Sequence, residues 1–325
     1  LKVTSVYNNS DLNVYWDGSE SSAWENPLNW TNNFGVFANA YPNITSGTID
    51  YTAASERDVN IRGFRMSGGT LNISGGTLKA TSRSSDFSNL HGTTHQTGGL
   101  FDVNTLELGS TTGSNAFYNL SGGELKIGRA SGGSSLYLGT NRGNGNSGNG
   151  TLTISGGRFT TRTGVELGDA TASGTGRFTV LGADASEIRI AGANTDSDGV
   201  WVQNSGSTLE VGIDFEGVTP IFLVDGTATT GTSATFASGS LLDVDYHNIT
   251  QGGGTWVVME VENGDITDNG LQFAPGVDTN IWSKTIDNSG TNGRLLVTAI
   301  GDPIGLDIVV GNLSLIHISE PTRRT

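Results

Sequence analysis

A pair of acidic side chains in the C-terminal half of the chain has a spacing that could support metal binding or proton transfer. Asp243 and Asp245 alternate within an apolar run, and His247 follows two positions later. Alternate residues of a β-strand project from the same face, so the two carboxylates would share one side of that strand. Such a pair can hold a metal ion or exchange a proton. Solvated carboxylates on the wet face of a sheet are the commoner explanation.

A second charged group lies near the middle of the chain. Arg158, Arg162 and Arg177 are interspersed with Glu166 and Asp169. Enzymes that cleave acidic polysaccharides gather such residues on one face of adjacent strands, and these five could converge in that way. Ion pairs on a solvated sheet face explain them equally well.

A short acidic loop resembles the first half of a calcium site. Asn194, Asp196 and Asp198 supply oxygen atoms at alternate positions, and Gly199 follows them. The bidentate glutamate that completes such a loop is replaced by Ser205. A polar turn is the simpler interpretation, and weak Ca²⁺ binding is the alternative.

The histidines form a poor metal site. His91 and His95 flank a polar Gly-Thr-Thr segment without a nearby carboxylate, while His247 and His317 are far away in the chain. The sequence contains no Gly-x-Ser-x-Gly elbow, zinc-protease motif or phosphate-binding loop. We therefore expect no catalytic residue and no cofactor.

Three of the six tryptophans, Trp16, Trp24 and Trp30, lie within fifteen residues. Exposed indole rings would form a platform on which sugar rings stack. Buried rings would instead close the open end of a stacked core, and their position near the start of the repeats favours this role.

Two recurring phrases indicate the elements that must position all these residues. One is an apolar residue, Ser-Gly-Gly, any residue and a second apolar residue, and it occurs at residues 66–71, 73–78, 120–125 and 154–159. The other is apolar-x-apolar-Gly, and its copies beginning at Leu106, Leu136 and Val165 are 30 and 29 residues apart. The alternation predicts short strands with one apolar face, and Ser-Gly-Gly predicts a sharp corner between strands.

A short strand–corner unit with a fixed period predicts a β-solenoid. We expect an all-β chain folded as a single-stranded, right-handed parallel β-helix with an N-terminal aromatic cap. A β-sandwich is the alternative, although its strands are usually longer and do not repeat one phrase. A helical fold is excluded by the glycine content and the absence of a helical apolar stripe.

The repeats also suggest domain limits. We expect a cap over 1–50, β-helix repeats over 51–213, and wider coils with a closing β-region over 214–300, where apolar runs suggest strands buried on both faces. Residues 301–312 would form a truncated linker. Residues 313–325 resemble the translation of a sequencing adapter, so we expect the native C-terminus to be missing.

Composition narrows the possible functions. The net charge is −15 with scattered basic residues, which argues against nucleic acid as a partner. The chain has no cysteine, so disulfides and thiolate metal sites are excluded. No apolar run approaches the ~20 residues of a membrane-spanning helix.

A family resemblance rests on the aromatic segment and the repeats together. Trp16-Asp-Gly18, then Trp24 and Asn29-Trp30, followed by Ser-Gly-Gly-x-Leu repeats, resemble bacterial autotransporter-type passenger regions. The resemblance implies an extracellular position on the bacterial outer surface and a structural or adhesin-like role. Surface glycans or other cell-surface proteins would be the partners. The alternative is a carbohydrate-binding or polysaccharide-degrading β-helix.

Overall fold

The computed structural model describes residues 13–299, except 32, 34, 54–59, 82–87, 129–134, 141–146, 172, 192–197, 226–231 and 248–252. This part of the chain is all-β, as predicted, and it contains the short 3-10 turn η1 (Pro27–Asn29). The predicted linker and adapter-like tail lie outside the described residues.

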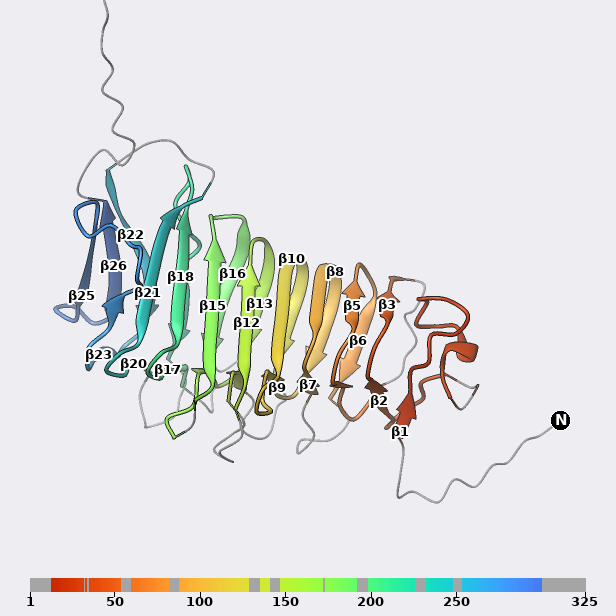
Figure 1. Cartoon of the computed structure of the whole chain (residues 1–325). Helices are drawn as coiled ribbons and strands as arrows, with labels where there is room; N and C mark the ends of the chain where they lie inside the picture. Colours follow the sequence, from red (N-terminus) through yellow and green to blue (C-terminus); the bar gives the residue numbers. More distant parts are fainter. Residues whose placement is uncertain are drawn as a thin grey trace, which may run out of the picture.

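The strands form three parallel stacks, which run the length of the molecule (Figure 1). The first stack consists, in order of pairing, of β1 (Asn13–Tyr15), β2 (Tyr41–Ile44), β4 (Arg65–Met66), β7 (Ser88–Leu90), β9 (Leu106–Leu108), β11 (Ser135–Leu138), β14 (Gly164–Leu167), β17 (Val200–Gln203), β20 (Ser233–Phe236) and β23 (Asp265–Asp268).

The second and third stacks share two long strands, β8 (Thr93–Val103) and β10 (Asn115–Ile127), which belong to the second stack at their N-terminal ends and to the third at their C-terminal ends. The second stack also contains β3 (Thr48–Tyr51), β5 (Thr70–Ile73), β12 (Asn149–Ile154), β15 (Thr175–Leu181), β18 (Thr208–Ile213), β21 (Leu241–Tyr246) and β24 (Gln272–Phe273). The third also contains β6 (Thr77–Ala80), β13 (Gly157–Thr161), β16 (Ala185–Ala191), β19 (Ile221–Val224) and β22 (Gly254–Val261).

The chain visits the three stacks in a fixed order, and we call one such passage a coil. For example, β11, β12 and β13 are followed by β14, β15 and β16, and each strand pairs in parallel with its equivalent. Leu106 lies opposite Leu136, which lies opposite Val165. The repeat spacing read from the sequence is therefore the true register of the first stack.

The core is a continuous column of apolar side chains between the stacks. Buried and partly exposed residues alternate along most strands, because successive side chains point to opposite faces. Aromatic rings fill the column, and Phe178 packs edge-on against both Phe159 and Trp201. Burying one such side chain contributes roughly 1.5–3 kcal/mol.

The Ser-Gly-Gly phrase makes corners between stacks, but not always as a loop. The copy at residues 67–69 lies between the first and second stacks, and the other three copies lie between the second and third. In β10 the phrase lies within one continuous strand, where the register against β8 shifts at Gly122. Gly122 keeps an ordinary conformation, while Gly123 adopts φ 74°. The corner is thus a bulge that bends a strand, which explains why β8 and β10 are longer than the predicted short strands.

The strands after residue 213 differ from the sequence expectation. They continue the same three stacks, and they bury one face rather than two: Ile221 and Leu223 are buried, whereas Phe222 is 40% exposed. The parallel order ends where β26 (Gly293–Ala299) pairs antiparallel with both β22 and β25 (Trp282–Asp287). No helix in the described part of the chain is long and apolar enough to cross a membrane.

Candidate functional site

The outer side of the third stack carries a group of charged residues, which we call the charged face: Asp102, Glu124, Lys126, Arg158, Glu187 and Arg189. These residues come from four successive strands, β8, β10, β13 and β16. Paired residues in neighbouring strands lie about 4.8 Å apart, so the side chains form rows across the coils.

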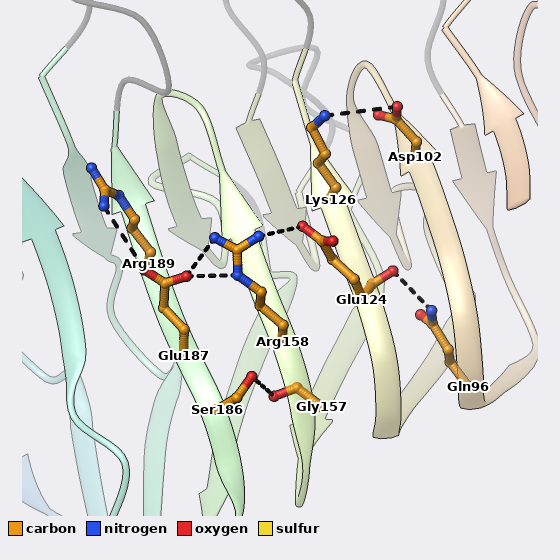
Figure 2. A network of polar contacts seen from close by, with 9 residues as sticks. All are labelled: Gln96, Asp102, Glu124, Lys126, Gly157, Arg158, Ser186, Glu187 and Arg189. Carbon is orange, nitrogen blue, oxygen red and sulfur yellow. Dashed lines mark hydrogen bonds and ion pairs between the residues drawn. The ribbon is translucent and has the colours of Figure 1, made fainter.

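Arg158 is the centre of one row. Its Nη1 donates to Glu124 Oε1 at 2.9 Å, and its Nε and Nη2 both lie 2.6 Å from Glu187 Oε2 (Figure 2). The hydrogen bond to Glu187 raises the pKa of Arg158 above its usual value, and the charge of Glu124 adds to this effect. Arg158 therefore ties three consecutive coils together.

The cations of the second row, Lys126 and Arg189, form looser pairs, one within their row and one with Glu187 of the first row. Lys126 Nζ lies 4.0 Å from Asp102 Oδ2, and Arg189 Nη1 lies 3.8 Å from Glu187 Oε1 (Figure 2). Burial raises the pKa of Asp102, and the nearby Lys126 opposes this effect only in part. These cations are held less tightly than Arg158.

A groove of 440 Å³ opens at this face. Its charged lining is Glu124, Lys126, Arg158, Arg162 and Arg189. The lining has four cationic side chains and one carboxylate, although the whole chain has a net charge of −15.

A separate ion-pair ladder lies on the second stack. Arg177 Nε donates to Glu210 at 2.8 Å, and its Nη2 donates to Asp243 at 2.7 Å. Burial raises the pKa of Glu210, but the hydrogen bonds from Arg177 and Thr179 outweigh burial, and the net shift is downward. Like Arg158, Arg177 bridges successive coils.

The charged cluster proposed from the sequence does not converge. Arg158 lies on the third stack, Arg177 on the second and Glu166 on the first. Asp169 is buried beyond β14, where it accepts hydrogen bonds from Thr140 and from the backbone and side chain of Thr171. Proximity in sequence misled here, because one coil distributes its residues over three faces.

The predicted carboxylate pair does share one strand face. Asp243 and Asp245 both project outward from β21, with buried Val244 between them. Asp243 is engaged by Arg177, and Asp245 accepts a hydrogen bond from the amide N–H of Tyr246. The two carboxylates therefore lie on a solvated strand face, and one of them, Asp243, belongs to an ion-pair ladder.

The histidine and calcium candidates remain separate. His91 Nε2 contacts Ser110 Oγ at 3.3 Å and burial lowers the pKa of His91, whereas His95 contacts Asn119 on the second stack. Asp198 is buried, and Asn194 and Asp196 lie outside the described residues, as does His317. No group of three or more potential ligands in the described ranges could hold a metal ion.

The prediction that the three tryptophans form an exposed platform for a ligand is wrong. Trp16 and Trp24 are each 6% exposed and Trp30 is 0% exposed, so no indole face is open to a sugar. Trp30 packs edge-on against both other rings, and its Nε1 donates to the carbonyl oxygen of Trp24 at 3.0 Å. The rings pack against each other because they occupy the interior at the N-terminal end of the stacks.

Sequence reasoning missed Asp102, Glu124, Lys126, Glu187 and Arg189 as members of the charged face. One signal was present: Glu124 and Arg158 both follow Ser-Gly-Gly, and equivalent positions of a repeat become neighbours across coils. The other members required the register of β8 and β16, which the sequence phrases do not provide.

No family model, curated protein or solved structure matches this chain.

Proposed function

We propose that this chain is an extracellular structural protein of a bacterial surface, of the autotransporter-passenger or adhesin type, without enzymatic activity. Its fold would be a single-stranded, right-handed parallel β-helix, with Trp16, Trp24 and Trp30 as the N-terminal cap. The observation that carries the proposal is the unbroken apolar column through successive coils. A stack held together along its whole length is suited to presenting a surface at a distance.

The ion-pair ladders support a mechanical role for the charged residues. Arg158 bridges Glu124 and Glu187, and Arg177 bridges Glu210 and Asp243, each across three coils. A general acid or base needs access to a substrate proton, whereas these carboxylates already bind guanidinium groups. Partly exposed pairs of this kind contribute up to about 1 kcal/mol each.

An activity screen with matched variants tests the non-enzymatic role. We expect the full chain to release no reducing or unsaturated ends from acidic polysaccharides, and Arg158→Ala and Arg177→Ala to lower the free energy of unfolding by up to about 1 kcal/mol each. Turnover that is lost in either variant would overturn the structural role.

The location has its own test. An antibody raised against the full chain should label intact cells of the source organism as strongly as permeabilised cells. Labelling only after permeabilisation would exclude the extracellular position.

A further inference from the structure

The groove at the charged face brings four cationic side chains together on an acidic molecule. Among the described residues, Lys126, Arg158, Arg162 and Arg189 line one groove with Glu124 as the only lining carboxylate. Two further carboxylates, Asp102 and Glu187, pair with cations of this groove. A cationic concavity on a negatively charged protein attracts anions locally, while the rest of the surface repels them. This contrast sets the groove apart from the ladder of Arg177.

Two of the cations can exchange partners with a ligand. The side chains of Lys126 and Arg189 are 44% and 39% exposed, and their nearest carboxylates are 4.0 and 3.8 Å away. Surface ion pairs of this length contribute little to stability. Because both side chains are partly exposed, their ammonium and guanidinium groups also have donors that solvent or a ligand can reach. A guanidinium fork binds a carboxylate through two parallel hydrogen bonds.

The spacing of these groups suits a chain of sugars. Lys126, Thr160 and Arg189 occupy one row through direct pairing, so the two cations are two strand spacings, or about 10 Å, apart. That distance is comparable with a disaccharide. Phe222 is next in the row, opposite Arg189, and its exposed ring offers an apolar surface.

We propose that this groove binds an acidic glycan built from uronic acids. Lys126 and Arg189 bind carboxylates of alternate sugars, and the ring of Phe222 packs against a pyranose face. The inference rests on the proposed extracellular function, because such glycans are met outside the cell. A nucleic acid is the weaker candidate, since its phosphate backbone needs a longer cationic track than this acidic protein has.

Calorimetric titration of the full chain with oligogalacturonate tests the proposal. We expect binding that weakens as salt is raised and no binding of neutral dextran oligomers. Lys126→Gln and Arg189→Gln should each weaken binding several-fold, and Phe222→Ser likewise. The double cation variant should lose tenfold or more. Arg294→Gln is the matched control, because Arg294 is an exposed cation paired with Glu260 outside the groove, and its affinity should equal that of the wild type.

Three outcomes overturn the proposal: no binding of oligogalacturonate, equal affinity of the double variant and the wild type, or tighter binding of single-stranded oligothymidylate. Circular dichroism of each variant establishes that the fold is intact. If oligogalacturonate does not bind but the antibody labels intact cells, only the proposal for the groove is wrong. If oligogalacturonate binds but the antibody does not label intact cells, the proposed extracellular location is wrong.

Discussion

Gly99 combines an unusual backbone conformation with a close approach between coils. Its φ is 70°, and an added Cβ would lie 2.6 Å from the carbonyl oxygen of Gly76 and 2.7 Å from the carbonyl carbon of Gly75. Both neighbours are backbone atoms of the preceding coil, so they cannot rotate away as a side chain would. The corner therefore requires glycine for two independent reasons.

We expect Gly99→Ala to lower the free energy of unfolding by about 2–4 kcal/mol, from backbone strain and overpacking together. Gly113→Ala is the control, because Gly113 has φ 78° but no atom within 4 Å of an added Cβ, and it should cost about 1–2 kcal/mol. Urea unfolding measures both. Equal losses of unfolding free energy in the two variants would show that the close contact between coils at Gly99 does not contribute to the cost.

Glu166 gives a pH-dependent prediction on the first stack. Burial raises its pKa, and the charge of Asp169 raises it further, against a hydrogen bond from Asn204. The folded state therefore holds the proton more tightly than the unfolded chain does. Stability falls as pH rises from the ordinary carboxyl pKa through the raised value, and stays lower above it.

Glu166→Gln should therefore be more stable than the wild type at neutral pH, and this gain should shrink as pH falls through the raised pKa of Glu166 toward the ordinary carboxyl value of about 4. Asp268→Asn should behave oppositely. Burial raises the pKa of Asp268, but N–H groups of Leu271 and Gly270 outweigh burial, so its pKa is lowered and its loss costs stability at neutral pH. Chemical unfolding across this pH range measures both. A common sign for the two variants would contradict the assignment.

At the scale of the element, each coil is stabilised mainly by its two neighbours, so damage at one end should stay local. Among the described residues, the N-terminal aromatic group lies at the first coil and packs against the coils that follow it. Trp24 stacks on Phe64, with ring centres 5.8 Å apart, and Trp30 contacts Trp24 and Trp16. These rings connect the first strands to the main column.

We expect Trp30→Ala to cost about 3–5 kcal/mol at this end. Hydrogen exchange should accelerate in β2 and β3 but not in β18 and β21. Leu28→Ala is the control, because Leu28 is 50% exposed beside the same cluster and should leave exchange unchanged. Uniform acceleration throughout the chain would instead indicate a single cooperative unit.

The repeated sequence phrases correctly predicted the register of strands in the first stack. Leu106, Leu136 and Val165 were aligned correctly, because each precedes the same corner glycine by three residues. The continuity of β8 and β10 was not predictable, since a Gly-Gly pair is equally compatible with a loop and with a bulge. The apolar run at 221–224 misled, because Phe222 is apolar yet faces outward.

At the scale of the whole molecule, the candidate site was the harder part to predict. A residue belongs to the charged face only if its strand lies in the third stack and its side chain points outward, and neither fact is local. Arg158 and Arg177 look equivalent in the sequence, yet they lie on different stacks. Charge counted over the chain likewise concealed the cationic groove.

The register across coils also has an evolutionary consequence. Leu136 and Val165 occupy equivalent places in successive coils, so recombination between their codons would add or remove one complete coil. The new neighbours would meet through the same corner geometry as the old ones. Such an event would change the length of the stack by about 4.8 Å and leave both terminal elements in place. We therefore expect any relatives of this chain to differ in length in steps of one coil.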